Sequence, residues 1–146
     1  MAKTLTKTPP LLDQQLCFAL YSTSRAITKA YADILADLGL TYPQYAAMLV
    51  LWQQDGLSVQ QIADRLFLEG ATTTPLIQRI EKMGLVRKER SAEDERRQEV
   101  FLTEEGRSLG ERAADVPVQL GCALNITDAK AHELLEEINK LRAAIT

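Results

Sequence analysis

Apolar residues recur at helical spacing through the first third of the chain. Between residues 13 and 38 this spacing predicts one long helix, with Asp13 as its N-cap and Gly39 at its end. Thr41 and Pro43 predict the start of a second helix that runs to Gln54. Its inner face carries Tyr45, Met48, Leu49 and Trp52.

Two short helices follow. Ser58, with Gln61 three residues later, has the spacing of a capping box and predicts a helix over residues 58–66. Residues 67–71 predict a turn, and residues 72–83 predict a helix with Pro75 in its first turn and Gly84 after its end. Three residues of this helix face inward: Leu76, Ile77 and Ile80.

The pattern then changes to alternation. Residues 85–90 and 98–102 alternate well enough for a two-stranded ribbon, with a charged tip over residues 91–97. A helix over residues 103–125, interrupted near Pro117, comes next. Thr127 and Asp128 cap a last helix whose apolar residues include Leu134, Leu135, Ile138 and Leu141.

This order of elements predicts a mainly α fold with a small β-wing, a winged helix-turn-helix over residues 43–102. We expect one domain over residues 1–146, in which residues 1–12 form a flexible tail. The helices of residues 13–40 and 103–146 carry more apolar surface than a small core can cover. We therefore expect a homodimer, dimerised through these N- and C-terminal helices, whose twofold symmetry matches two DNA half-sites.

Composition sets the class of protein. The chain has 146 residues, of which 46% are hydrophobic and 25% charged, as in an ordinary globular domain. It has no apolar run near the roughly 20 residues that span a bilayer, and its first residues do not resemble a signal peptide. We expect a cytoplasmic protein with no membrane partner. The one histidine, His132, has no partner cluster, so we expect no metal and no cofactor.

Charge is distributed unevenly along the chain. The net charge is −3, yet residues 76–97 hold seven basic and five acidic side chains. Positive charge on the helix of residues 72–83 and on the wing is typical of a surface that binds DNA phosphates. A solvated hairpin tip is the alternative interpretation of the wing alone. The predicted DNA-binding residues are Thr72, Thr73, Thr74, Gln78 and Arg79 on the helix, and Arg87, Asp94, Arg96 and Arg97 on the wing, where Asp94 would orient an arginine toward a minor groove.

The two cysteines, Cys17 and Cys122, are far apart in the sequence. In a reducing compartment such a pair is ordinarily two unrelated buried thiols. Cys17, however, falls in the first turns of the predicted first helix, where the helix dipole favours a thiolate.

Two segments resemble a known family. Residues 94–97, Asp-Glu-Arg-Arg, follow the helix-turn-helix and resemble the wing of the MarR family of dimeric bacterial regulators. Residues 12–24, LDQQLCFALYSTS, are similar to the sensing-helix motif of its organic-hydroperoxide branch, the OhrR repressors. The likeness covers residues 11–145, and the sensing-helix motif is its more specific part. Glu69 and Gly70 depart from the Asp-Ser pair that many relatives carry there.

The resemblance implies a chemistry for the two cysteines. Cys17 matches the peroxidatic cysteine, and Tyr31 and Tyr42 match the tyrosines that hydrogen-bond its thiolate. Apolar Leu16, Phe18 and Trp52 would favour hydrophobic hydroperoxides. Cys122 matches the resolving cysteine of two-cysteine members. Oxidation of Cys17 to a sulfenic acid and condensation with Cys122 of the partner subunit would give an intersubunit disulfide.

The expected function is therefore a redox-sensing, DNA-binding transcriptional repressor of the oxidative stress response. Its partners would be double-stranded operator DNA, a second copy of the chain and an organic hydroperoxide as inducer. A MarR-type repressor released by a phenolic small-molecule ligand is the alternative. A thiol peroxidase would use the same cysteines, but it would leave the threonine-headed helix and the basic wing unexplained, so we expect no enzyme.

Overall fold

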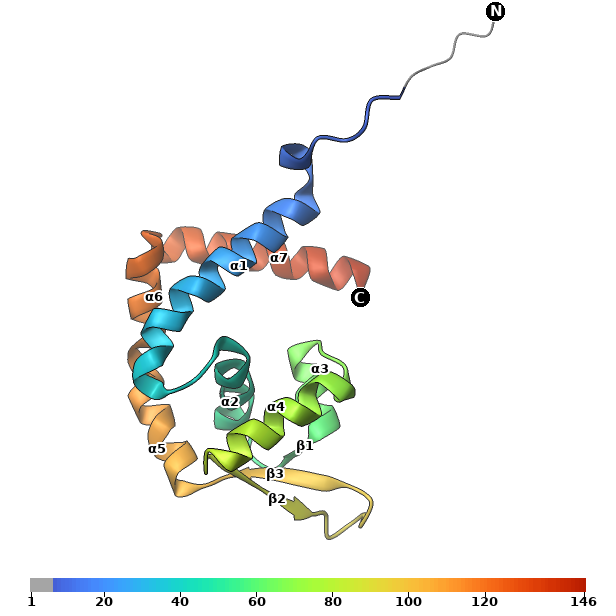
Figure 1. Cartoon of the computed structure of the whole chain (residues 1–146), viewed down its shortest axis with the longest axis vertical. Coiled ribbons are helices and arrows are strands. Elements are labelled where there is room, and N and C mark those ends of the chain that lie inside the picture. Colours follow the sequence, from blue (N-terminus) through green and yellow to red (C-terminus); the bar gives the residue numbers. More distant parts are fainter. Residues whose placement is uncertain (1–6) are drawn as a thin grey trace, which may run out of the picture.

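The computed structural model describes residues 7–146, so the first six residues of the predicted tail lie outside the described residues. Figure 1 shows short helices and a small sheet gathered in a lower body, with the long helices nearest the two ends of the chain above it. The helices and strands are α1 (Leu16–Leu35), α2 (Tyr42–Gln53), β1 (Leu57–Ser58), α3 (Val59–Leu66), α4 (Gly70–Lys82), β2 (Val86–Arg90), β3 (Gln98–Leu102), α5 (Glu104–Arg112), α6 (Val116–Leu124) and α7 (Asp128–Ile145). This is the predicted winged helix-turn-helix with a small antiparallel β-wing, and the fold class is confirmed.

The lower body, α2 to β3, is called the head below. Its first two helices, α2 and α3, start where the sequence predicts, because Thr41 and Ser58 each form a capping box with the glutamine three residues later. Its core is continuous and includes Met48, Leu51, Ile62, Ile77, Ile80 and Val100. Burial of these side chains supplies the main stabilisation of the head.

The sheet has a third strand that the sequence pattern does not reveal. Strand order is β1-β3-β2, all antiparallel, with Leu57 opposite Val100 and Val86 opposite Leu102. Two residues are too few for alternation to show. The preceding Asp55 fixes this corner, because its carboxylate accepts hydrogen bonds from the backbone N–H groups of Gly56 at 3.0 Å and Leu102 at 2.8 Å.

The first helix begins later than predicted. Gln15 is extended at φ −95° and ψ 123° and separates α1 from a single 3-10 turn, Leu12–Gln14, that contains Asp13. The prediction that Asp13 caps α1 is therefore wrong. Cys17 becomes the second residue of α1, nearer the helix N-terminus than expected.

Helix α4 begins earlier than predicted, at Gly70 rather than Thr72. The chain reverses within residues 67–69, because Phe67 adopts a left-handed conformation at φ 55° and ends α3. Pro75 consequently lies in the second turn of α4, not the first. The predicted break near Pro117 also lies upstream, in the 3-10 turn Ala113–Asp115, and Leu49, predicted to face inward, is exposed.

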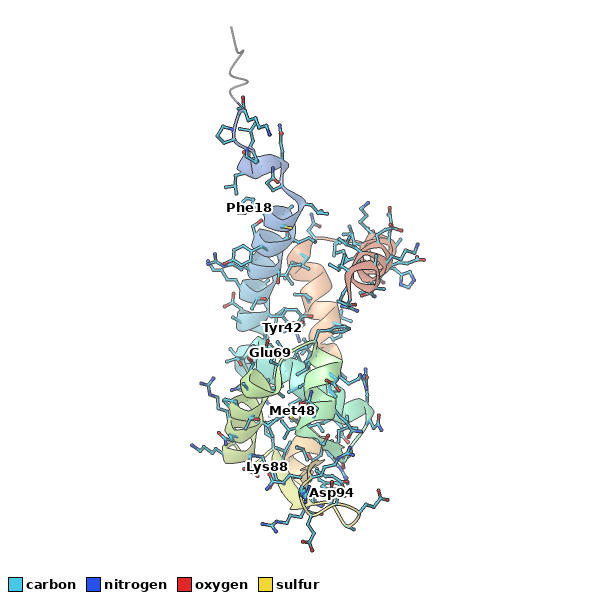
Figure 2. The ribbon with its side chains drawn as sticks, turned by 90° about the vertical axis from the view of Figure 1, so that its right-hand side faces the viewer. Phe18, Tyr42, Met48, Glu69, Lys88 and Asp94 are labelled. Atoms are coloured by element: carbon cyan, nitrogen blue, oxygen red, sulfur yellow. The ribbon has the colours of Figure 1, made fainter. Side chains whose placement is uncertain are left out.

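The upper helices leave apolar surface uncovered. Helices α1 and α6 pack against each other, whereas α7 has no buried residue. Figure 2 shows α7 end-on, beside the α1–α6 pair rather than within it. Its exposed apolar side chains are Leu134, Leu135, Ile138, Leu141 and Ile145. Helices in proteins take most of their stability from packing of an apolar face, so we expect the apolar face of this 18-residue helix to be covered.

Among residues 7–146, no single helix is both long and apolar enough to cross a membrane. Residues 16–38 followed by α2 meet the length and composition test only as a pair bent by 68°.

Helix α5 packs closely against the head at Gly106. A Cβ there would overlap the backbone carbonyl of Leu85, which cannot move freely because it accepts the N–H of Thr103 at 3.1 Å. We expect Gly106→Ala to lower the free energy of unfolding by about 1–3 kcal/mol, measured by urea denaturation. Gly70→Ala is the matched control, since its Cβ would meet only the flexible end of Gln60. If the two variants were equally stable, the close packing of α5 against the head would not depend on the missing Cβ of Gly106.

Candidate functional site: a DNA-facing surface and two thiols

The buried residues of α4 recur at helical spacing and leave its other face exposed. Thr72, Thr74, Gln78 and Arg79 are exposed. Thr73 is fully buried, and its hydroxyl donates to the carbonyl of Glu69 at 3.0 Å. Thr73 lies three residues before Leu76 and four before Ile77, so it belongs to the same inward stripe of the helix. The prediction that Thr73 contacts DNA is therefore wrong.

The wing tip is held by its own backbone. The carboxylate of Asp94 accepts the backbone N–H of Arg96 at 3.0 Å, and the buried Ser91 hydroxyl accepts those of Glu93 and Asp94. The N–H of Ser91 closes the loop onto the carbonyl of Arg97 at 2.8 Å. Asp94 thus shapes the turn, and within residues 7–146 it forms no ion pair that would orient an arginine, contrary to the expectation.

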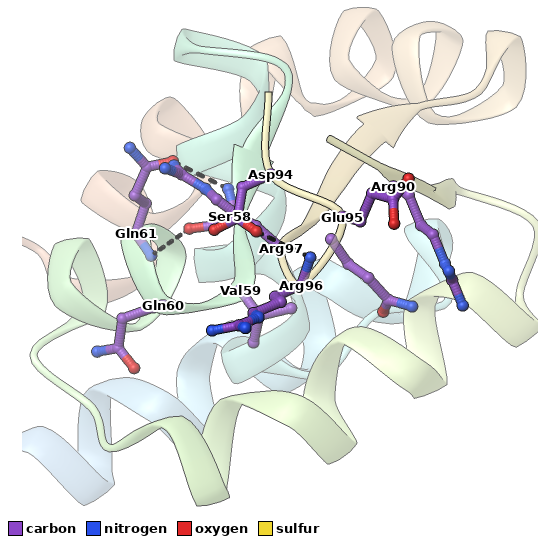
Figure 3. Close-up of a pocket in the computed structure, with 10 residues that line it drawn as sticks. Ser58, Val59, Gln60, Gln61, Arg90, Asp94, Glu95, Arg96 and Arg97 are labelled. Carbon is purple, nitrogen blue, oxygen red and sulfur yellow. Dashed lines mark hydrogen bonds between the residues drawn. The ribbon is translucent and has the colours of Figure 1, made fainter. Parts of the chain in front are cut away.

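A groove of about 720 Å³ separates the wing tip from the start of α3. Figure 3 shows Arg90, Arg96 and Arg97 on the wing side, with Gln60 and Gln61 on the α3 side. The three arginines are exposed and form no salt bridge within the described part of the chain. This wall can therefore hold anionic oxygens without first breaking an internal ion pair.

Arg87 has a different environment from the tip arginines. Its guanidinium contacts the Glu89 carboxylate at 2.8 Å, donates to the carbonyl of Leu102 at 3.1 Å and lies 5.2 Å from the centroid of the Phe101 ring. These contacts hold it on the ribbon. The sequence selected Arg87 and omitted Arg90, because the charge count identifies the basic segment without showing which side chains are free.

The two thiols are free and exposed. Cys17 lies near the N-terminus of α1, and Cys122 lies on α6 beside a groove of about 340 Å³ that Pro117, Gly121 and Asn125 help to line. At 1.5 Å per residue, Tyr31 is about 21 Å further along α1 than Cys17. In Figure 2, Phe18, the neighbour of Cys17, stands at one end of α1 and Tyr42 toward the other.

The predicted tyrosines do come together, but away from the thiol of their own chain. The ring centroids of Tyr31 and Tyr42 are 4.9 Å apart, and Tyr45 lies 5.7 Å from Tyr31. Burial first, and then the neighbouring Tyr42 and Tyr45, raise the pKa of Tyr31 from 10.0 to about 12. Tyr31 is therefore a protonated hydrogen-bond donor at neutral pH.

Trp52 was expected among the apolar groups around Cys17. Instead its indole Nε1 donates to the carbonyl of Gly106 at 2.8 Å, so the ring joins the head to α5.

Comparison with known proteins identifies the family. The model of the family described as "Transcriptional regulator SarA/Rot" matches residues 29–112. The chain belongs to the MarR/SarA family of transcriptional regulators. This is a family of regulators and not of enzymes.

The relatives in this family are similar over nearly the whole chain. The HTH-type transcriptional regulator TtmR of Methylorubrum extorquens (strain PA1) is 42% identical over 142 residues, covering 97% of this chain and 73% of TtmR. The organic hydroperoxide resistance transcriptional regulator of Bacillus subtilis (strain 168) is 40% identical over 134 residues, covering 92% of this chain and 86% of the relative.

A solved structure adds a state-specific comparison. Reduced AbfR bound to DNA superposes with a TM-score of 0.76 at 29% identity, covering 92% of this chain and 94% of AbfR. The disulfide-formed state of AbfR superposes with a TM-score of 0.65 at 31% identity, covering 92% of each chain. AbfR is a protein of Staphylococcus epidermidis.

The raised pKa of Tyr31 makes stability depend on alkaline pH. Both folded and unfolded chains keep the proton below about pH 10, and between about pH 10 and the folded pKa of about 12 the unfolded chain loses it first. The free energy of unfolding should therefore fall over this interval. Tyr31→Phe should reduce that fall, as measured by urea midpoints from pH 9 to 11.5. Tyr21→Phe, at an exposed position, is the control, and an unaltered slope in Tyr31→Phe would contradict the assignment.

Proposed function

We propose that this regulator is a DNA-binding repressor released when an organic hydroperoxide oxidises Cys17. The observation that carries the proposal is the placement of an exposed thiol at one end of α1 and, at the other end, a pair of phenol donors packed against each other. One chain cannot join them, whereas two chains with antiparallel α1 helices can. The 40% identity to the organic hydroperoxide resistance regulator of Bacillus subtilis supports the same assignment.

The DNA-facing surface is the exposed face of α4 together with the wing tip. Thr72, Thr74, Gln78 and Arg79 would lie along a major groove, and Arg96 and Arg97 would reach the flanking minor groove or its phosphates. Neither set of side chains is needed by the core. Reduced AbfR has been solved bound to DNA, and its likeness to this chain supports the same use of the head here.

The second copy is required by packing as well as by chemistry. The apolar face of α7 and the exposed leucines Leu11, Leu12 and Leu16 before and at the start of α1 have no cover in one chain. Two copies related by a twofold axis would cover these faces and bring Cys17 to the partner's Tyr31 and the partner's Tyr42. We infer that the phenols then donate to the thiolate.

The oxidation chemistry balances with the groups present. The Cys17 thiolate attacks the distal oxygen of the hydroperoxide, the S–O bond forms, the O–O bond breaks and the alkoxide leaves as an alcohol after gaining a proton. The thiolate of Cys122 of the partner subunit then attacks the Cys17 sulfur. The S–S bond forms and hydroxide leaves as water after protonation, so two thiols have reduced one hydroperoxide.

We infer that the two cysteines of one chain are too far apart for an intrachain disulfide. Val116, at the start of α6, shares a groove with Ile34 near the end of α1, which fixes how the two helices meet. From there Cys122 is about 9 Å along α6, whereas Cys17 is about 26 Å back along α1. A disulfide needs Cα atoms within about 7 Å, so the partner's cysteine is the available one.

A movement of α6 can be transmitted to the head through α5. Helix α5 is fixed to the head by the Trp52–Gly106 hydrogen bond and by the 3.0 Å ion pair of Arg107 with Asp55. Its last residue, Arg112, donates to the carbonyl of Asp37 at 2.8 Å, at the end of α1. The turn Ala113–Asp115 separates α5 from α6. Pulling Cys122 toward a sulfenic acid would therefore rotate α5 and change the spacing of the two heads.

The proposal is tested by a gel-shift titration of a short promoter DNA from the regulator's own locus. Reduced protein should bind, cumene hydroperoxide should abolish binding, and dithiothreitol should restore it. Cys17→Ser should bind and ignore the oxidant. Cys122→Ser should lose the intersubunit disulfide on a non-reducing gel.

Two further results separate the competing functions. Arg96→Ala with Arg97→Ala should lower the DNA affinity of the reduced protein at least tenfold, as expected when phosphate contacts are lost. Binding by wild-type protein that is indifferent to oxidant but lost with a phenolic ligand would replace the redox proposal with the ligand-released repressor. Continuous peroxide consumption with dithiol would instead indicate a peroxidase.

A further inference from the structure

We propose that Tyr45 is a positioning residue that holds Tyr31 and Tyr42 together as hydrogen-bond donors. This inference rests on the proposed function, because it concerns the same thiol chemistry. Tyr45 does not itself contact the sulfur in the scheme above. Its part is to fix the two rings that do.

The ring of Tyr45 contacts both donors. Its centroid lies 5.7 Å from that of Tyr31 and 6.5 Å from that of Tyr42, with interplanar angles of 42° and 51°. Tilted rings at these separations attract one another beyond the burial of their area. Tyr45 thus completes a triangle whose third side is the 4.9 Å Tyr31–Tyr42 pair.

Burial differs sharply among the three rings. Tyr45 is 3% exposed, whereas Tyr42 is 37% exposed and has solvent on one side. A ring open to water on one side is restrained only by what covers its other side. Tyr45 and Tyr31 supply that cover, so removing the Tyr45 ring would give Tyr42 additional rotamers and Tyr31 an empty neighbour.

Tyr45 is itself held in place by its contact with Trp52. The Trp52 ring meets it edge-on, with centroids 6.3 Å apart and planes at 66°, and the Trp52 Nε1 donates to Gly106 of α5. A Cβ on Gly110 would come within 2.9 Å of that nitrogen, so α5 lies directly against the indole. The order of contacts is α5, Trp52, Tyr45, then the two donors.

The consequence is kinetic. Two phenols held in place favour a thiolate more than two phenols that visit the same position part of the time, because the ordering cost is already met. Loosening them should slow hydroperoxide attack and shift the pH profile of the rate toward higher pH. The packing of Tyr45 in the core thereby affects the rate of Cys17 oxidation, although Tyr45 itself does not contact the hydroperoxide.

The experiment measures the second-order rate of Cys17 oxidation by cumene hydroperoxide in full-length Cys122→Ser protein, by quenched flow and dimedone labelling, from pH 5 to 9. Tyr45→Met fills the space with a flexible side chain, and we expect a rate about tenfold lower and a pH profile displaced by about one unit. Tyr45→Phe keeps the ring and should stay within about twofold of the parent.

Leu51→Ala is the matched control for general destabilisation. Leu51 is equally buried in α2 but belongs to the aliphatic core, so its truncation should lower stability and leave the rate within about twofold. Trp52→Leu is a second variant that leaves all three tyrosines in place. It should slow the reaction about threefold by freeing Tyr45, and it carries the test if Tyr45→Met does not fold.

The outcomes separate this inference from the function on which it rests. A slow Tyr31→Phe beside a normal Tyr45→Met would overturn the positioning role alone. A Tyr45→Phe or Leu51→Ala variant as slow as Tyr45→Met would also overturn it, by assigning the effect to the hydroxyl or to general destabilisation. Normal rates in both Tyr31→Phe and Tyr42→Phe would refute the proposed donors, and the inference with them.

Discussion

The length of α1 between Cys17 and Tyr31 is the constraint on which the functional account depends. A helix is a rigid spacer with a fixed rise, and about 21 Å of it separates the thiol from the phenols. Side-chain rotation cannot close such a gap. Any chemistry that uses both groups must therefore run between two chains. The same helix bears uncovered apolar residues at its start, and α7 is uncovered along its apolar face, so the packing and the proposed chemistry point to the same second copy.

In the head, the residues that form the core are different from those on the exposed face. Thr73, Ile77 and Ile80 of α4 are buried, while Thr72, Thr74, Gln78 and Arg79 remain outside. The wing tip satisfies its own backbone through Ser91 and Asp94, which leaves Arg96 and Arg97 uncommitted. The contacts of α5 with the head and with the end of α1 make it the mechanical link between this surface and the thiols.

Much of the fold was predictable because its determinants are local. The capping boxes at Thr41 and Ser58 and the stop at Gly84 are read from neighbouring residues, and the structure confirms them. Other features depend on tertiary contacts. The left-handed Phe67 moves the start of α4 to Gly70. Thr73, by contrast, stands at helical spacing from Leu76 and Ile77, so its place in the core could have been read from the sequence pattern. Strand β1 exists only because β3 pairs with it.

The site was predictable in its residue types but not in its arrangement. The resemblance to the OhrR repressors selects Cys17, Tyr31 and Tyr42, and the structure brings the two tyrosines together. Tyr45 looked like an ordinary core tyrosine, since only the three-dimensional contacts show that it joins both donors and Trp52. The pairing of Arg87 with its own strand was likewise invisible to a count of charges.

The central claim, that the thiol of one chain meets the tyrosines of the other, has a direct measurement. Tyr31→Cys in a Cys122→Ser background leaves two cysteines about 21 Å apart in one chain and adjacent across the proposed dimer. Mild oxidation with copper phenanthroline, followed by a non-reducing gel and peptide mapping, should give a covalent dimer through residues 17 and 31. A protein that stays monomeric on that gel, while remaining a dimer in solution, would contradict the account.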